Sequence, residues 1–310
     1  MVVAAKLWPK SNDRSAEGEE RLKLFDGQLS ALVVALTTLY QLTHSLSHCS
    51  KRGPCPEMNL AKLIFGCVGA FALAACSTVN MEGGSHFPSN LPQPTDFEIH
   101  GIDVSKYQGL IDWSQVRQSG VQFAWIKATE GGDNADSLFQ RNWAEAKAAG
   151  IPRGAYHFVY WCRPWQEEIR WFEQNVPVED DALPPVLDVE ATPTSKTCKR
   201  TLYRDEVLAQ MRQMLQEMQR HFGKKPVIYS TVDFYAGILA GGGLSDYPIW
   251  VRSTKYSPSV KYGSRRWHFW QYQSDARIPG ISGKVDRNAF FGTAKQWDAF
   301  LAGNNLPMEY

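Results

Sequence analysis

From residue 97 onward, short apolar runs alternate with segments in which apolar residues recur every three or four positions. The short runs are typical of buried strands, and the periodic segments are typical of amphipathic helices. We predict strands at residues 99–105, 121–128, 153–160, 184–190, 226–230, 248–252, 267–273 and 284–290. We predict helices at residues 113–119, 137–149, 165–175, 202–222 and 293–301, with Gly150 and Gly223 as helix stops.

The alternation of strands with helices indicates a parallel sheet. About eight strands in roughly 215 residues fit a β/α barrel. The later connections between strands are short, which favours an irregular barrel over a regular one. The predicted fold class is therefore α/β, an irregular TIM-like (β/α) barrel that forms a single domain over residues 97–310.

The first 96 residues have a different pattern. In residues 1–57, polar stretches surround one apolar run at residues 29–40, which is too short to cross a bilayer. Residues 58–75 begin with Met58, carry one lysine, continue in an apolar run and end in small residues, as a secretory signal does. We therefore expect Met58 to be the true start. Residues 1–57 are then upstream sequence translated in error, or alternatively a genuine extension.

The signal ends in Leu-Ala-Ala-Cys at residues 73–76, which resembles the lipobox of bacterial lipoproteins. The resemblance implies that Cys76 is acylated and becomes the first mature residue, which anchors the chain to a membrane without spanning it. Ser77 follows in place of an aspartate retention signal, which favours the outer membrane and an exported domain that faces the periplasm. The alternative is a buried apolar helix that contains a cysteine. Residues 76–96, rich in glycine and proline, are predicted to be a flexible tether after the lipidated cysteine.

Composition narrows the class of partner. The formal net charge is +1 and no long basic stretch occurs, which argues against nucleic acid. The chain has 11 Trp and 12 Tyr, which suit either a core or a cleft in which flat rings stack on sugars. No spacing of cysteine and histidine suggests zinc. We expect no metal, no cofactor and a monomer.

Four acidic residues fall near predicted strand ends. Asp188 and Glu190 are two residues apart in one strand, so their side chains point to the same face with Cα atoms roughly 6.6 Å apart. Asp103 lies near the end of the first strand and Asp286 lies in the last. Because β/α barrels carry their active sites at the C-terminal ends of the strands, we expect the four carboxylates to converge. Repulsion between two close carboxylates leaves a proton donor beside a charged partner, as cleavage of a glycosidic bond requires.

Seven stretches in order resemble the motifs of glycoside hydrolase family 25, the Chalaropsis-type lysozymes or N-acetylmuramidases. They are residues 101–113 (GIDVSKYQGLIDW), 123–131 (FAWIKATEG), 154–158 (GAYHF), 187–190 (LDVE), 228–230 (IYS), 270–272 (WQY) and 285–288 (VDRN). The resemblance covers about residues 98–302. It implies a hydrolase that cleaves the β-1,4 bond between N-acetylmuramic acid and N-acetylglucosamine, with peptidoglycan glycan strands as its partner.

The resemblance also implies roles for single residues. Glu190 is the expected proton donor, and Asp188 is its acidic partner, which stabilises the transition state or orients the acetamido group of the substrate. To donate a proton, Glu190 needs a pKa above the ordinary ~4.3, and we expect neighbouring aspartate charges to raise it. Asp103 and Asp286 complete the acidic cluster. The implied substrate-binding residues are Tyr156, Tyr229, Trp270, Gln271, Lys127 and Tyr107.

Three further features bear on the site. Arg252 stands where a small residue is expected, and it pairs with an acid at the rim, meets a peptide carboxylate or is a surface arginine. Cys162 and Cys198 follow neighbouring predicted strands, and in an oxidising compartment we expect a disulfide between them beside Glu190. His157 is expected to face away from the cleft and to be packed and hydrogen-bonded.

Two other functions compete with the muramidase interpretation. A chitinase-type barrel requires a further aspartate two residues before Asp188, where this chain has Val186. A catalytically inactive, lipid-anchored peptidoglycan-binding protein would keep the aromatic cleft but lose one of the four acids, and all four are present. For a muramidase reaction, three groups are candidates to attack the sugar: water, Asp188 and the substrate's own acetamido group.

Overall fold

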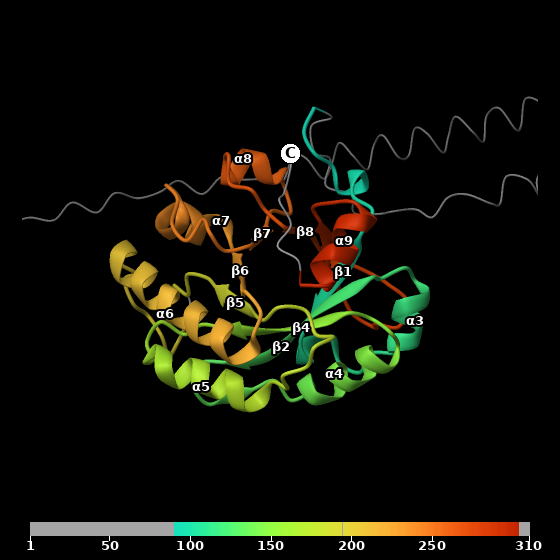
Figure 1. The fold of residues 1–310 in the computed structure, drawn as a ribbon, viewed down its shortest axis with the longest axis horizontal. Helices are drawn as coiled ribbons and strands as arrows, with labels where there is room; N and C mark the ends of the chain where they lie inside the picture. Colours follow the sequence, from blue (N-terminus) through green and yellow to red (C-terminus); the bar gives the residue numbers. More distant parts are fainter. Residues whose placement is uncertain (1–89, 194, 304–310) are drawn as a thin grey trace, which may run out of the picture. The chain divides into compact units, whose positions relative to one another are not determined.

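The computed structural model describes residues 90–193 and 195–303, which contain the predicted barrel (Figure 1). The predicted extension, the signal at residues 58–75, Cys76 and most of the tether lie outside the described residues. The last residues of that tether form a short 3-10 helix, η1 (Pro94–Asp96). Within the described part, no helix is long and apolar enough to cross a membrane.

Eight strands close into a barrel (Figure 1). The strands β1 (His100–Val104) and β2 (Phe123–Glu130), first and eighth in the order of the sheet, pair with each other and complete the ring. A short ninth strand, β3 (Asn134–Ala135), pairs with β2 alone. In order around the barrel the strands are β1 (His100–Val104), β9 (Val285–Phe290), β8 (Phe269–Ala276), β7 (Ile249–Arg252), β6 (Val227–Ser230), β5 (Val186–Val189), β4 (Arg153–Phe158) and β2 (Phe123–Glu130).

The barrel is mixed, so the expectation of a fully parallel sheet is wrong at one strand. Strand β9 runs antiparallel to both of its neighbours, β1 and β8. The link between β8 and β9 covers only residues 277–284, whereas a parallel crossover needs about a dozen residues or more. The predicted class, an irregular α/β barrel, is confirmed. Because β9 is reversed, its first residues lie at the same end of the barrel as the last residues of the other strands.

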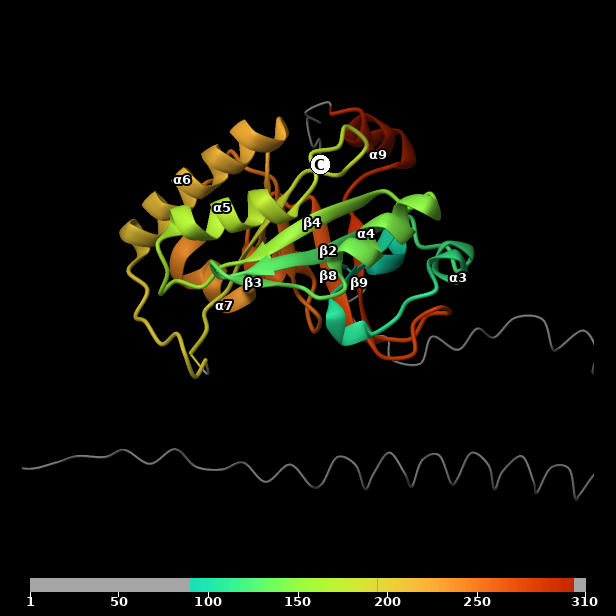
Figure 2. The ribbon, with the colours of Figure 1, turned by 90° about the horizontal axis from the view of Figure 1, so that it is seen from below.

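Helices cover the outside of the barrel unevenly. The long helices α4, α5 and α6 lie side by side over β2, β4 and β5 (Figures 1 and 2). Only the five-residue helix α8 lies between β7 and β8, which agrees with the short late connections in the sequence. The helices are α3 (Trp113–Gln118), α4 (Phe139–Ala148), α5 (Trp165–Asn175), α6 (Arg204–Phe222), α7 (Val232–Phe234), α8 (Pro258–Tyr262) and α9 (Ala294–Leu301), with a 3-10 turn η2 (Lys106–Gln108) and a π-helical turn η3 (Tyr235–Leu239).

The interior of the barrel is filled by aromatic rings. Trp125 and Trp250 stack with ring centroids 5.7 Å apart, and both are almost fully buried. Gly154 on β4 faces Trp125 so closely that any Cβ at this position would collide with the indole ring. This packing closes the barrel, so that a cleft can exist only at its end.

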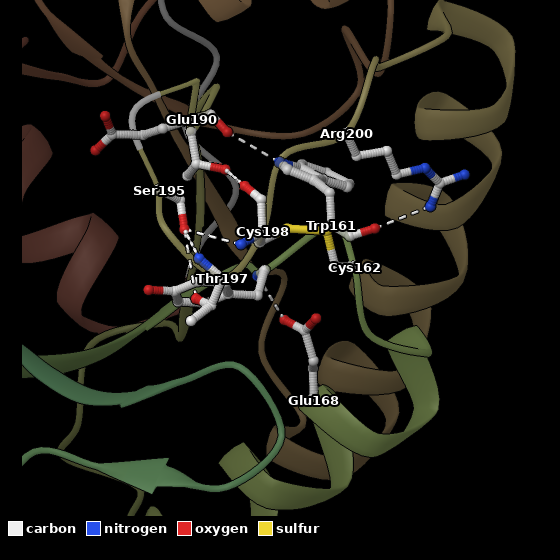
Figure 3. Close-up of a disulfide and its surroundings, with 10 residues drawn as sticks. Trp161, Cys162, Glu168, Glu190, Ser195, Thr197, Cys198 and Arg200 are labelled. Carbon is white, nitrogen blue, oxygen red and sulfur yellow. Dashed lines mark hydrogen bonds between the residues drawn. A yellow bond between two sulfur atoms is a disulfide. The ribbon is translucent and has the colours of Figure 1, made fainter.

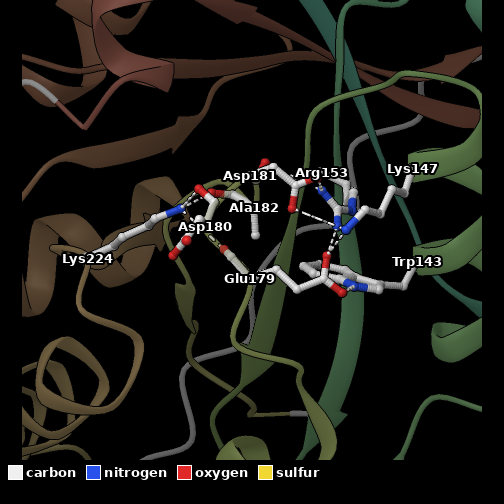
Figure 4. A network of polar contacts seen from close by, with 8 residues as sticks. All are labelled: Trp143, Lys147, Arg153, Glu179, Asp180, Asp181, Ala182 and Lys224. Carbon is white, nitrogen blue, oxygen red and sulfur yellow. Dashed lines mark hydrogen bonds and ion pairs between the residues drawn. The ribbon is translucent and has the colours of Figure 1, made fainter.

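A network of charges joins β4 to the segment before β5 at the N-terminal end of the barrel (Figure 4). Arg153, 1% exposed, pairs with Glu179 and Asp181 and lies 4.6 Å from the ring of Trp143. Lys224 donates to the carbonyl oxygen of Asp180 at 2.7 Å. Residues at this end of a barrel serve stability, and here they hold the chain that leads into β5.

Candidate active site

The four acids predicted from the sequence line one cleft of about 420 Å³. Asp103 lies in β1 and Asp188 in β5, while Glu190 follows β5 directly. Asp286 lies in the reversed strand β9, directly opposite Asp103 in the antiparallel register. The reversal of β9 therefore brings Asp286 to the acidic end, although it stands near the start of its strand.

Most of the other predicted residues line the same cleft. Lys127, Tyr156, Tyr229 and Gln271 do so, and Tyr107 lies at the rim with 81% of its surface exposed. The cleft also contains residues that sequence reasoning did not single out for it. These are Ser105, Phe158, Trp250 and Ser274.

Trp270 does not line the cleft, although we expected it beside Gln271. Successive residues of a strand face opposite sides, so the cleft can receive only one of these two neighbours in β8. Trp270 is fully buried in the layer outside the barrel, and its indole N–H donates to the carbonyl oxygen of Ser253 at 2.8 Å. Trp250 supplies the aromatic surface in its place, and its ring packs against Tyr229 with centroids 4.5 Å apart. Strand alternation applied to residues 248–252 and 267–273 could have identified this exchange.

A hydrogen-bonded chain fixes the carboxyl group of Asp103. Its Oδ2 accepts from Gln271 Nε2 and from Asn288 Nδ2, both at 2.8 Å. The Tyr229 hydroxyl donates to Gln271 Oε1 at 3.0 Å, and Trp250 Nε1 donates to Asn288 Oδ1 at 2.8 Å. Asn288 is fully buried and was not predicted as a site residue, although it lies in the stretch at residues 285–288. These bonds fix the orientation of the Asp103 carboxyl group at the bottom of the cleft.

Asp188 and Glu190 both bind protons more tightly than ordinary acids. Burial raises the pKa of Asp188, which is 6% exposed, and the charge of Glu190 raises it further. Burial also raises the pKa of Glu190, and Arg252 and Lys127 oppose that rise. The main cause for Glu190 is thus loss of water, not the aspartate charges that we expected. Both carboxyl groups therefore keep their protons to higher pH than ordinary acids do.

Asp103 and Asp286 form a second pair of acids, and their pKa values differ from each other. Burial raises the pKa of Asp103 to about 6, against its hydrogen bonds from Asn288 and Gln271. Burial and the charge of Asp103 raise the pKa of Asp286 to about 8. At neutral pH, Asp103 is therefore the charged member and Asp286 the neutral one.

Two cations balance these acids. Lys127 Nζ lies 2.5 Å from Glu130 Oε2 and 5.0 Å from the centroid of the Phe158 ring. Arg252 faces the cleft and lowers the pKa of Asp103, Glu190 and Asp286. In residues 90–193 and 195–303, no carboxylate lies within 4 Å of its guanidinium. Of the three alternatives for Arg252, the structure thus disfavours an ion pair with a rim acid.

The oxygen Oδ1 of Asp188 has no hydrogen-bond partner among the described residues, although it is buried. A buried acceptor without a donor is costly, and functional sites tolerate such groups where a ligand supplies the partner. The amide N–H of a bound sugar is a donor of the required kind. The peptide carbonyl of Asp188 is satisfied, because it accepts from the backbone N–H of Val159 at 3.0 Å.

The remaining predictions concern residues around the cleft. Cys162 and Cys198 form a disulfide with Cα atoms 5.6 Å apart (Figure 3). His157 is fully buried away from the cleft, with hydrogen bonds to Thr129 at 2.7 Å and to Glu168 at 3.1 Å, as expected. Across the part of the chain that the structure covers, no group of three or more His, Cys, Asp or Glu side chains is arranged to hold a metal ion.

Comparisons with known proteins agree with this geometry. Residues 102–281 match the family model "Glycosyl hydrolases family 25". The chain is 38% identical over 215 residues to the uncharacterized protein YegX of Escherichia coli K12, which covers 68% of this chain and 76% of YegX. It is 36% identical over 220 residues to lysozyme M1 of Streptomyces globisporus, with 66% and 72% covered.

Solved structures show the same fold. A family 25 glycosyl hydrolase from Bacillus anthracis superposes with a TM-score of 0.61 at 32% identity, over 72% of this chain and 98% of that one. A lysozyme from Streptomyces coelicolor also has a TM-score of 0.61, at 33% identity over 67% and 98%. The barrel and its acidic cleft agree with the family that these comparisons identify. The chain belongs to glycosyl hydrolase family 25.

Proposed function

We propose that the domain is a muramidase that cleaves the β-1,4 bond between N-acetylmuramic acid and N-acetylglucosamine in peptidoglycan. The observation that carries the proposal is the pair Asp188 and Glu190 in one cleft, with burial raising the pKa of both. Membership of family 25 implies peptidoglycan as the substrate, and one relative is named a lysozyme. All four cleft acids are present, which supports catalysis over binding alone.

Glu190 acts as the proton donor in this proposal. It is less buried than Asp188, so the oxygen of a leaving sugar can reach its carboxyl. When the acetamido N–H of the substrate donates to the free Oδ1 of Asp188, it stabilises the charged form of Asp188. The charge of ionised Asp188 then favours retention of the proton on Glu190, because a nearby negative charge raises the pKa of a carboxyl group. Substrate binding therefore sets the two protonation states that the reaction needs, and ionised Asp188 opposes the positive charge that builds at the anomeric carbon.

The aromatic residues supply the sugar-binding surface. Burial raises the pKa of Tyr156 and of Tyr229, so both hydroxyls stay protonated and neutral beside the acids. The ring of Trp250 is near both, with centroids 6.5 Å from Tyr156 and 4.5 Å from Tyr229. We assign these three residues to the sugar site next to the cleaved bond.

Digestion of purified cell wall by the full chain tests the proposal. Wild type should release new reducing ends, and mass spectrometry of the muropeptides should show N-acetylmuramic acid at those ends. Glu190→Gln should lower the rate by about 10²–10⁴-fold, the usual contribution of a general acid. Glu145→Gln is the matched control, because Glu145 is a partly exposed acid on α4 that does not line the cleft and forms a salt bridge with Arg141 on the same helix. Binding to cell wall without new reducing ends would favour the inactive binding protein instead.

We also propose that the chain is a lipoprotein exported to the cell envelope and held in the outer membrane. The support is the signal pattern at residues 58–75 and the cysteine at position 76. The Cys162–Cys198 disulfide fits an oxidising compartment. Membrane fractionation of Cys76→Ala tests this proposal. A variant that stays membrane-bound to the same extent as wild type would contradict it.

A further inference from the structure

Glu190 stands one residue beyond the end of β5, where the sheet no longer fixes its peptide. Its carbonyl oxygen accepts a hydrogen bond from the indole Nε1 of Trp161 at 2.9 Å (Figure 3). Trp161 comes from the loop between β4 and α5, which also supplies the Val159 N–H to the Asp188 carbonyl at 3.0 Å. One loop therefore holds the backbone of both residues of the acid pair.

Trp161 is itself held on several sides. It is 2% exposed, and its ring stacks on Phe234 with centroids 5.5 Å apart and an interplanar angle of 17°. Its own carbonyl accepts from Arg200 Nη1 at 2.9 Å. The next residue, Cys162, is bonded to Cys198, which lies eight residues after Glu190 (Figure 3). The loop after β4 is thus tied to the segment after β5 at two points. One is the hydrogen bond from Trp161 to the Glu190 carbonyl, and the other is the Cys162–Cys198 disulfide.

We propose that Trp161 is a positioning residue for Glu190, and that the Cys162–Cys198 disulfide holds Trp161 in place for that role. The inference rests on the proposed muramidase function. Trp161 does not line the cleft, so it acts on the reaction only through the peptide of Glu190. The carboxyl group projects from that peptide, and a small displacement of it changes both its distance to the leaving oxygen and its exposure to water.

Trp161→Phe is the direct test, because phenylalanine keeps a ring to stack on Phe234 but has no N–H. We expect kcat on soluble glycan fragments to fall about 3- to 10-fold, the size of one net hydrogen bond, with KM within twofold of wild type. The freed carboxyl of Glu190 should gain water, which lowers its pKa. The alkaline limb of the kcat profile should then move to lower pH.

Trp143→Phe is the matched control. Trp143 is also buried, and its indole Nε1 donates to Glu179 Oε1 at 3.3 Å in the segment that precedes β5. The substitution removes the same kind of bond but leaves the cleft untouched. We expect wild-type kcat and a wild-type pH profile from this variant. The melting temperature of both variants separates a loss of stability from a loss of positioning.

The double variant Cys162→Ser/Cys198→Ser gives a second, independent test. It should lower kcat and move the alkaline limb in the same direction as Trp161→Phe. Adding Trp161→Phe to that background should cost less than it costs in wild type, because the two changes loosen the same contact. If Trp161→Phe does not fold, the disulfide variant alone decides.

Several results would overturn the inference. They are wild-type kcat and an unmoved alkaline limb in Trp161→Phe or in the disulfide variant, a change confined to KM, full additivity of the two changes, or an equal loss of kcat in Trp143→Phe. A wild-type chain that releases no reducing ends would instead refute the muramidase function itself.

Discussion

Replacing Asp103 by asparagine should stabilise the folded domain at neutral pH while it damages the cleft. The carboxyl of Asp103 is buried, with 8% of the residue exposed, and its pKa rises from the ordinary 3.8 to about 6. At 1.36 kcal/mol per pH unit, that difference corresponds to ~3 kcal/mol of lost stability once the group is fully charged. Asparagine keeps an oxygen that can accept from Gln271 and Asn288 but carries no charge.

The size of this stability gain depends on pH. Below pH 3.8 the carboxyl is protonated in the folded and the unfolded chain alike, so the substitution gains nothing. Between 3.8 and about 6 the unfolded chain releases its proton while the folded chain keeps it, and wild type loses stability as the pH rises. Weaker hydrogen bonds to a neutral amide offset part of the gain. We expect Asp103→Asn to be ~1–3 kcal/mol more stable than wild type at pH 7.5 and equal to it near pH 3.5.

Urea denaturation at both pH values, with a fixed m value, measures this difference. Asp112→Asn is the matched control, because Asp112 is an exposed helix N-cap whose pKa is lowered by hydrogen bonds from Gln115 and Ser114. That control should not gain stability at pH 7.5. If Asp103→Asn is no more stable than wild type at pH 7.5, or gains equally at both pH values, the burial argument for the cleft acids is refuted.

Three further predictions follow from named contacts. Arg252→Gln should move the alkaline limb of kcat to higher pH, because the guanidinium lowers the pKa of Glu190 and its loss keeps the donor protonated longer. Arg153→Met should lower the free energy of unfolding by ~1–3 kcal/mol, measured in urea, since its partners are partly exposed and its role is structural. Gly154→Ala should cost ~1–3 kcal/mol or more in the same assay, because a Cβ collides with Trp125.

Each of these predictions has a contrary result. An unmoved or lower alkaline limb in Arg252→Gln would show that the guanidinium does not govern Glu190. Unchanged unfolding of Arg153→Met, or a loss of kcat per folded molecule, would contradict a purely structural role. Wild-type stability of Gly154→Ala would show that the barrel interior has room beside Trp125.

Local pattern was enough to place the eight barrel strands and the longer helices, but not β3, α7, α8 or η3. An apolar run such as residues 226–230 favours a buried strand, and β6 lies there. The helix predicted at residues 165–175 has the same bounds in the structure. The spacing of Asp188 and Glu190 and the ordered motifs also pointed to one acidic cleft. These properties depend on neighbours in the chain, so the sequence by itself determined them.

Other properties depend on segments that are distant in the chain. The short link at residues 277–284 favours the reversal of β9, but the pairing of β9 with β1 sets Asp286 opposite Asp103. Trp250 lines the cleft and Trp270 does not, because this depends on which face of each strand points into the barrel. The pKa values of the acids depend on how much water the closed barrel excludes, and the hydrogen bond from Trp161 to Glu190 spans 29 residues. Only the tertiary structure decided these features, because burial and long-range contacts are properties of the packed barrel.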